Sequence, residues 1–269
     1  MANKVFFTSD THYNHANIIK HSRRTAFMSQ AELDTLAAVD REDVDYHTLK
    51  ISRESVERMN QKFIDNTNEV VGEDDVLYHL GDVFWGDDFN VWKAIRDRIK
   101  CKTIHHIWGN HDRPDVAKLF TSSSQYREVI VDGGSKVFLC HYPMRSWNKS
   151  HRGSICLYGH VHGHTCMEDR YGINIENEYI LRDRFNTILT DALPNAPTDT
   201  NLIIDKLMQS IVIPKTNTLD VGVDTHNYKP WSIEEIRREL VSRALVTNRI
   251  YENRYVKDFE KFKPVIGKL

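Results

Sequence analysis

Short apolar runs recur along the chain, and each of several ends in a turn rich in histidine, aspartate or asparagine. Runs of this length bounded by small or polar residues are typical of buried strands. The strands expected with such endings span residues 4–9, 76–80, 103–108, 136–140 and 155–158, followed by DTH, GD, GNHD, HYP and GHVHGH. Two further strands are expected at residues 128–131 and 219–223.

Helical patterns lie between these runs. A short helix is expected at residues 16–24, and the spacing of Val56, Met59 and Phe63 predicts an amphipathic helix opened by Ser52 as N-cap. Residues 91–99 predict another, and a capping box of Ser232 with Glu235 opens a helix to about residue 246. Alternating strands and helices indicate a layered α/β fold, in which ligands collect at the carboxyl ends of strands.

Two segments depart from this alternation. Residues 25–53 are polar and charged, which favours helical or irregular surface structure. Residues 167–217 include a turn-rich stretch, DALPNAPTDTN, and suit a lid, a specificity loop, an oligomer contact or a plain surface elaboration. We therefore expect a single domain over residues 1–269, with insertions at about 25–53 and 167–217 and a helical C-terminal tail over about 232–269.

The polar residues at the strand ends form a set with metal-ligand chemistry. They are Asp10, His12, Asp82, Asn110, His111, His141, His160 and His162. Imidazole nitrogens mixed with carboxylate and amide oxygens, without thiolates, suit Mn²⁺, Fe²⁺, Zn²⁺, Co²⁺ or Ni²⁺ better than a structural zinc site. The set is too large for one ion with open positions and suits two ions that share a carboxylate.

Composition narrows the possible partners. The chain of 269 residues carries 36 basic and 38 acidic side chains, a net charge of -2, which argues against a broad nucleic-acid-binding face but not against a local one. Its four cysteines lack CxxC spacing, and no signal peptide is apparent, so we expect reduced thiols and a cytosolic protein. No apolar run approaches the roughly 20 residues of a membrane-spanning helix.

In their order, these five blocks resemble the calcineurin-like metallophosphoesterase superfamily over residues 5–163. The segment LDVGVDTHNYKPWSIEEI also resembles the last strand and helix of small bacterial and phage members. The resemblance implies a four-layer α/β/β/α sandwich with mixed sheets, and a phosphoric ester hydrolase that uses two divalent metal ions, with Mn²⁺ favoured. A bacterial or phage-infected cytoplasm is expected on the same ground.

The family's roles carry over position by position as expectations. The resemblance implies that the first metal is bound by Asp10, His12 and His162, the second by Asn110, His141 and His160, and that Asp82 bridges them. His111 would contact the substrate phosphate and protonate the leaving oxygen, and Asp112 would hold the imidazole of His111 in position.

For several other residues near these blocks, the sequence leaves two interpretations open. His15 reaches either substrate or only its own turn, and the guanidinium of Arg145 suits either a phosphate or a nearby carboxylate. We assign both as candidate substrate contacts. Tyr13, Trp85 and Trp147 either stack on a base or pack in the core. Of His105 and His106, at least one is expected to be packed or capping.

The expected function is therefore a dinuclear-metal phosphodiesterase acting on a nucleotide or nucleic acid, with a hydroxide shared by the two ions as nucleophile. A phosphomonoesterase and a dinucleoside polyphosphate hydrolase remain alternatives. A non-catalytic metal-binding scaffold is a more distant one.

Overall fold

The computed structural model describes residues 3–131, 134–144, 146–163 and 217–250, with side chains up to residue 242 in the last helix. Arg145, residues 167–216 of the insertion predicted at residues 167–217, and the end of the predicted C-terminal tail lie outside these ranges. The prediction of a single domain over residues 1–269 includes them and stays a prediction.

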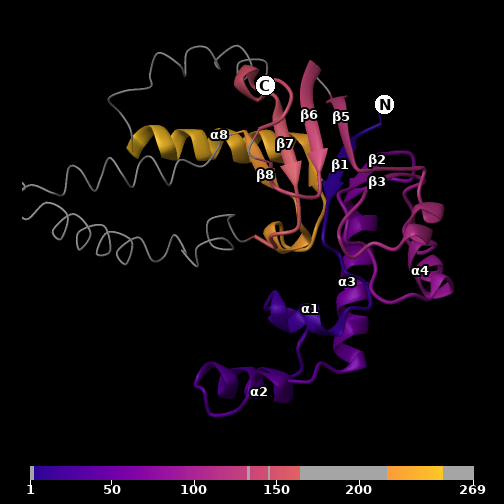
Figure 1. Ribbon diagram of the computed structural model, residues 1–269, viewed down its shortest axis with the longest axis vertical. Helices are drawn as coiled ribbons and strands as arrows, with labels where there is room; N and C mark the ends of the chain where they lie inside the picture. The colour runs from indigo at the N-terminus through magenta and orange to yellow at the C-terminus, as the bar shows by residue number, and fades with distance from the viewer. Residues whose placement is uncertain (1–2, 132–133, 145, 164–216, 251–269) are drawn as a thin grey trace, which may run out of the picture.

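Two mixed β-sheets form the centre of the fold (Figure 1). The first has the order β4-β3-β2-β1-β9, parallel except for β9, and the second has the order β5-β6-β7-β8, parallel except for β5. The strands are β1 (Val5–Thr8), β2 (Val76–His79), β3 (Thr103–Ile107), β4 (Ser122–Ser124), β5 (Tyr126–Val131), β6 (Ser135–Cys140), β7 (Ile155–Tyr158), β8 (Thr218–Asp220) and β9 (Trp231–Ser232). The seven predicted strands are all present, and the layered α/β fold with two mixed sheets is confirmed.

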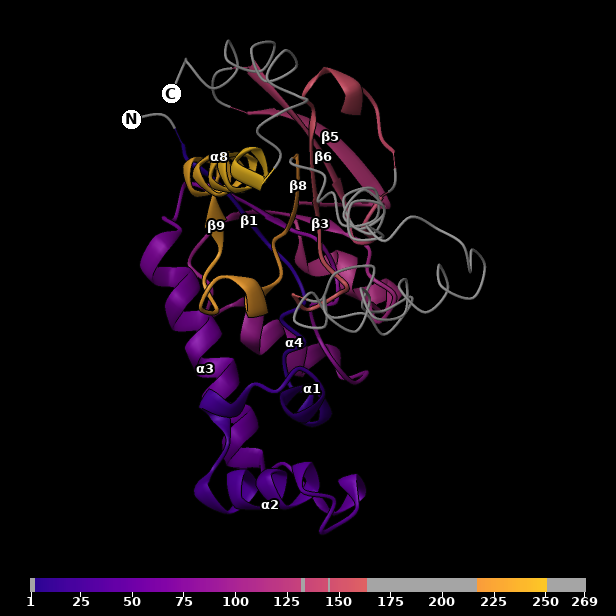
Figure 2. The same ribbon diagram turned by 90° about the vertical axis from the view of Figure 1, so that its left-hand side faces the viewer.

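The two sheets share one apolar core. Phe7 and Ile107 of the first sheet belong to the same buried cluster as Leu139, Leu157 and Leu219 of the second. Helix α8 (Ile233–Ile250) contributes to this cluster and contacts β1, β8 and β9, so it joins the neighbouring edges of the two sheets (Figure 2). The core therefore fixes the carboxyl ends of both sets of strands close to one another.

Helices α1 (Ala16–His21), α3 (Arg53–Val70) and α4 (Phe89–Arg96) accompany the first sheet. The described residues also form short 3₁₀ turns: η1 (Thr25–Phe27), η2 (Tyr46–Thr48), η3 (Pro114–Leu119), η5 (Ser150–Arg152) and η7 (Val223–Thr225). The predicted N-cap of α3 is confirmed, because Ser52 accepts a hydrogen bond from the backbone N–H of Ser55. The capping box of Ser232 with Glu235 is likewise present at the start of α8.

The segment predicted as a surface insertion folds as an arm at the far end of α3 from the sheets (Figures 1 and 2). Its helix, α2 (Gln30–Asp40), begins with a capping box between Ser29 and Glu32. The carboxylate of Glu32 also accepts from the backbone N–H of Ser52 and the hydroxyl of Ser55, each at 2.6 Å. One buried carboxylate thus caps α2 and fastens it to the start of α3.

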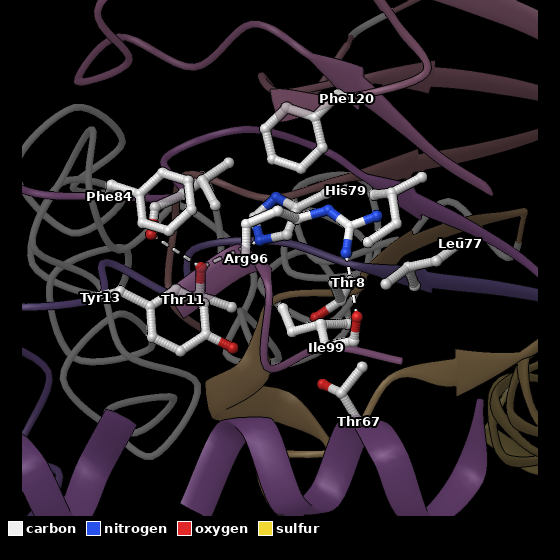
Figure 3. A pocket seen from close by; sticks show the side chains of 12 residues that line it. Thr8, Thr11, Tyr13, Thr67, Leu77, His79, Phe84, Arg96, Ile99 and Phe120 are labelled. Atoms are coloured by element: carbon white, nitrogen blue, oxygen red, sulfur yellow. Dashed lines mark hydrogen bonds between the residues drawn. The ribbon is translucent and has the colours of Figure 1, made fainter. Parts of the chain in front are cut away.

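A small cavity lies behind the ends of β1 and β2 (Figure 3). On its wall, the ring of His79 lies with Nε2 3.0 Å from the hydroxyl of Thr11, and its Nδ1 accepts from the backbone N–H of Gly81. Burial lowers the pKa of His79 to about 3, so the ring is neutral. It supports the loops after β1 and β2 from behind.

Candidate metal centre

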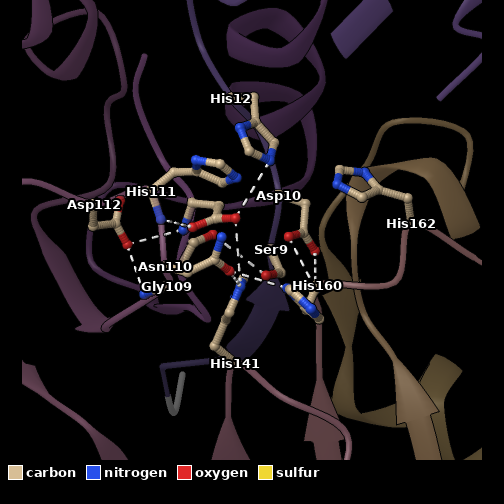
Figure 4. Close-up of polar contacts among 12 residues, drawn as sticks. Ser9, Asp10, His12, Gly109, Asn110, His111, Asp112, His141, His160 and His162 are labelled. Atoms are coloured by element: carbon tan, nitrogen blue, oxygen red, sulfur yellow. Dashed lines mark hydrogen bonds and ion pairs between the residues drawn. The ribbon is translucent and has the colours of Figure 1, made fainter. Parts of the chain in front are cut away.

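The loops after β1, β2, β3, β6 and β7 converge on one point between the two sheets (Figure 4). They carry the predicted metal ligands, and the structure brings all of them together. Oxygen and nitrogen atoms of these side chains form two adjacent groups: a first cluster of Asp10, His12 and His162, and a second cluster of Asp82, His141 and His160. Within each cluster the candidate ligand atoms lie within 4.8 Å of one another.

The backbone is strained at the ligand positions. Five of them have a positive φ: Asp10 (57°), His12 (46°), Asp82 (55°), His160 (74°) and His162 (51°). Residues other than glycine rarely adopt this left-handed region, and strain of this kind clusters at functional sites. The repeated conformation turns each side chain sharply out of its strand toward the same point.

Glycines let the loops approach closely. A Cβ atom at Gly109 would overlap the carboxylate of Asp82, and one at Gly159 would overlap Ser9 and the carboxylate of Asp10. A Cβ at Gly81, where φ is 101°, would lie 2.5 Å from the backbone nitrogen of Gly109. The glycines of the GD, GNHD and GHVH blocks are therefore required by contact between the loops.

The first cluster contains a buried imidazole with unused nitrogens. His12 is 1% exposed, and in the described part of the chain neither of its ring nitrogens has a hydrogen-bond partner. Burial, with His162 close by, lowers the pKa of His12, so the ring is neutral. A buried polar atom without a partner is costly, and a divalent cation removes that cost by accepting the lone pair. The cluster thus fits a metal ion.

In the second cluster, the backbone orients one of the histidine ligands. Nδ1 of His141 donates to the carbonyl oxygen of Leu80 at 2.8 Å, so Nε2 is the nitrogen that faces the cluster and would bind an ion after losing its proton. The side-chain oxygen of Asn110 lies 3.1 Å from this Nε2 and 3.0 Å from Nδ1 of His160. Burial opposes protonation of His141, but the carboxylates of Asp82 and Asp10 outweigh burial and raise its pKa to about 9.

The carboxylate of Asp82 lies between the two clusters. Its Oδ2 is 3.5 Å from Nε2 of His12 and 3.4 Å from Nε2 of His141. Its Oδ1 accepts from the backbone N–H of His111 at 2.8 Å. One oxygen therefore faces a ligand of each cluster, and the other is held by the GNHD loop.

Asp10 ties the two clusters together from the opposite side. Both of its carboxylate oxygens accept from the backbone N–H of His160 at 3.0 Å. Asp10 is fully buried, and this burial raises its pKa above the ordinary value. A nearby cation would stabilise the ionised form of such a carboxylate.

Two residues that were not among the predicted site residues hold the first cluster. Asp224 lies 2.8 Å from Nδ1 of His162 and accepts two hydrogen bonds from Arg24, at 2.8 and 2.9 Å. Arg24 is completely buried and also donates to the carbonyl oxygens of Asp10 and Thr11. Asp224 follows an apolar strand, as Asp10 does, and this signal was available. A single arginine after a short helix gave none.

The expected contact between Asp112 and the ring of His111 is corrected by the structure. The Asp112 carboxylate accepts from the backbone N–H groups of Asp82, Val83 and Gly109, at 2.8 to 2.9 Å, and lies 2.9 Å from Nε2 of His106. These bonds outweigh burial and lower its pKa to about 2. With its oxygens so engaged, Asp112 fastens the GD loop to the GNHD loop, and His106 is the packed histidine expected of the pair.

The candidate substrate contacts differ in exposure. His111 is exposed at the edge of the centre, and its ring centroid lies 5.4 Å from that of His12. His15 is 8% exposed, and its ring is stacked at 3.7 Å on that of Trp85. Burial lowers the pKa of His15 to about 4. Tyr13 and Trp147 are buried packing residues, whereas Trp85 is 42% exposed.

Comparison with known proteins defines the class. Residues 44–177 match the model of the calcineurin-like phosphoesterase superfamily domain, and the chain therefore belongs to that superfamily. The match begins after the DTH block, but the structure places Asp10 and His12 of that block against the matched region. Membership and the two clusters together support a metal-dependent phosphoesterase.

Individual relatives extend the similarity over most of the chain. An uncharacterized protein of Methanocaldococcus jannaschii is 26% identical over 249 residues, which is 92% of this chain and 96% of that protein. The crystal structure of a protein of unknown function from Aquifex aeolicus aligns with a TM-score of 0.50 and 19% identity, over 88% of this chain and 99% of that one. The second similarity shows the fold alone. Among the helices of the described residues, none has the length and apolar character needed to span a bilayer.

Proposed function

We propose that this protein hydrolyses a phosphodiester, with a nucleotide or nucleic acid as substrate, at a centre of two divalent ions. When bound, such a pair of ions neutralises the charge of the phosphate and activates water for attack on phosphorus. Mn²⁺ is our first choice, because the donors are imidazole, carboxylate and amide groups without thiolates. The buried thiols of Cys101 and Cys140, which form no disulfide within the described residues, suit a reducing compartment, and we propose a cytoplasmic location.

The observation that carries the proposal is the carboxylate of Asp82 between His12 and His141. A single buried ion would not require two neighbouring clusters that share an oxygen between them. In this assignment Asp10, His12 and His162 would hold one ion, and Asn110, His141 and His160 would hold the other. Asp82, whose Oδ2 lies near a nitrogen of each cluster, would contribute to both.

His111 is our candidate for acting on the leaving group. Its backbone N–H is bound to Asp82, while its imidazole is exposed beside His12. In this position the ring contacts a phosphate at the centre and gives a proton to the departing alkoxide. A diester of an ordinary alcohol needs this proton more than an aryl ester does, because alkoxides are poor leaving groups.

The choice of a diester rests on the flanks of the centre. Two exposed aromatic side chains lie on either side: Trp85, with its ring 5.3 Å from that of His111, and Tyr142, with its ring 4.9 Å from that of His160. A diester carries two organic groups on phosphorus, and an aromatic surface on each side suits two nucleosides better than a monoester.

The test is hydrolysis of bis-p-nitrophenyl phosphate and p-nitrophenyl phosphate, with Mn²⁺ and after chelation, by the wild type and Asp82→Asn. We expect faster, metal-dependent cleavage of the diester. The substitution should lower kcat/KM by about 100-fold or more, because a shared ligand serves both ions.

Asp74→Asn is the matched control, because Asp74 is an exposed acid far from the centre in an ion pair with Lys102. Its kcat/KM should stay at the wild-type value. Faster cleavage of the monoester would favour a phosphatase. Equal turnover by Asp82→Asn, or metal binding without turnover of either ester, would contradict the proposal and favour a non-catalytic scaffold.

A further inference from the structure

Trp85 is an exposed aromatic side chain held rigidly beside the metal centre. It lies in the loop between β2 and α4, three residues after Asp82, and the residue is 42% exposed. One face is stacked on His15, with ring centroids 3.7 Å apart and an angle of 3° between the planes. Its backbone N–H donates to the carbonyl oxygen of Tyr13 at 2.8 Å. A large indole surface exposed to water indicates a binding site only where contacts fix its orientation. The contacts just described fix the orientation of this one.

His15 fixes the indole without competing for its open side. The ring of His15 is buried and lies nearly parallel to the indole. It therefore acts as a flat support on one side of the indole. Since one face of Trp85 is taken by His15, a planar ligand has the other face available.

We infer that Trp85 is a specificity-determining residue of this centre, which binds a planar group attached to the leaving oxygen of the substrate. The inference rests on the proposed function. His111 lies beside the leaving oxygen in that proposal, and the ring of Trp85 is 5.3 Å from the ring of His111. A nucleobase or another aromatic group on the leaving alcohol would lie over the indole. Stacking of a base on an aromatic side chain is sequence-tolerant, so the site selects planarity and not a particular base.

Tyr142 gives the competing orientation. It is 44% exposed, and its ring lies 5.0 Å from that of His141 and 4.9 Å from that of His160, on the side of the second cluster. Among the described contacts of Tyr142, the only histidines are members of the two clusters. A leaving group that faced Tyr142 would therefore have no further histidine beside it. Trp85 has His111, and the leaving group is therefore assigned to the Trp85 side.

The experiment compares two diesters that differ only in the leaving group, phenyl methyl phosphate and 2-naphthyl methyl phosphate, with Mn²⁺. The measured quantity is the ratio of kcat/KM for the naphthyl ester to that for the phenyl ester. Trp85→Ala should lower this ratio by about 10-fold, and Trp85→Phe by less, because phenylalanine keeps a planar surface. Tyr142→Ala should keep the wild-type ratio.

Tyr126→Ala serves as the matched control, since Tyr126 is an exposed aromatic residue on β5 outside the centre. Its ratio and both rates should equal those of the wild type. An unchanged ratio in Trp85→Ala, or a ratio lost in Tyr142→Ala instead, overturns the inference while leaving the diesterase intact. Absence of turnover on both esters in the wild type refutes the proposed function itself.

A binding readout separates stacking from catalysis. Adenosine 5′-monophosphate, a probe with a planar base, should quench the tryptophan fluorescence of the wild type. The quenching should be largely lost in Trp85→Phe. Equal quenching in the two proteins would mean that another indole is responsible, which contradicts the assignment.

Discussion

At the scale of single residues, the centre is defined by atoms whose bonding is incomplete. The two ring nitrogens of His12 are buried without partners in the described residues, whereas the ring of His162 is oriented by Asp224. A histidine that binds metal through one nitrogen commonly uses the other to hold its orientation. Asp224 and Arg24 therefore set how well His162 serves the first cluster.

Replacing Asp224 tests this role. Asp224→Asn removes the negative charge that faces both Arg24 and His162, so Arg24 is left buried with a weaker partner and the ring of His162 is less constrained. We expect Mn²⁺ affinity to fall by about 10- to 100-fold, measured by isothermal titration calorimetry. Asp40→Asn, at an exposed ion pair with Arg23, is the control and should bind as the wild type does. Wild-type affinity in Asp224→Asn would show that the contact does not position a ligand.

Sequence patterns reach this scale only in part. Asp10, Asp82 and the histidines were identifiable because each follows an apolar run within a recognisable block. The role expected of Asp112 was wrong in detail, since its oxygens bind backbone N–H groups and not the ring of His111. A carboxylate can hydrogen-bond to any of several nearby groups, and the choice depends on how loops from different strands approach one another. Spacing along the chain does not predict this approach.

At the scale of elements, the apolar runs predict where the strands lie. The turns toward the metal centre determine where several of these strands end. Residues 9, 80 and 108 were included in predicted strands but leave the ladder, because the chain turns there toward the metal centre. Strand β4 was not predicted, since Ser122–Ser124 carries no apolar signal and is ordered by pairing with β3. Strand β9 is too short to give one.

The arm around α2 depends on a single carboxylate. Glu32 accepts from the backbone N–H groups of Ser29 and Ser52 and from the hydroxyl of Ser55, each at 2.6 Å. These hydrogen bonds outweigh burial and lower its pKa to about 2. Because the folded state favours the ionised form, this stabilisation is complete above the ordinary carboxyl pKa and is lost as pH falls through about 2.

Glu32→Gln should therefore destabilise the protein at neutral pH. The amide keeps the shape of the side chain but offers one acceptor oxygen, whereas the carboxylate offers two. The charge-assisted hydrogen bonds of the carboxylate are therefore weakened. We expect a loss of about 1–3 kcal/mol in the free energy of unfolding, measured by urea denaturation at pH 7. The difference from the wild type should shrink as pH is lowered toward 3. Glu54→Gln, in the exposed first turn of α3, is the control and should change stability little. A pH-independent difference would contradict the assignment.

At the scale of the whole molecule, the metal centre concentrates negative charge inside the protein. Asp10 and Asp82 are both buried close to one another, and two such carboxylates oppose folding unless positive charge lies beside them. Divalent ions bound at the two clusters would therefore contribute to the stability of the fold as well as to its chemistry.

Metal removal makes that contribution measurable. Ions that bind only the folded state raise stability by about 2.7 kcal/mol at a concentration 100 times the dissociation constant. Mn²⁺ should raise the Tm of the chelated protein by several degrees in calorimetry, and Asp82→Asn should show a smaller shift. An equal shift in both proteins would place the stabilising ion elsewhere.

Each candidate ion site takes donors from both sheets. Asp10 and His12 follow β1 of the first sheet, while His162 follows β7 of the second; the second cluster is divided in the same way between Asp82 and His141 with His160. Any sliding of one sheet across the other would pull both coordination spheres apart at once. Bound ions would thus hold the two sheets in a fixed position relative to one another. Backbone amide protons on the facing strands should then exchange with solvent more slowly once both sites are filled.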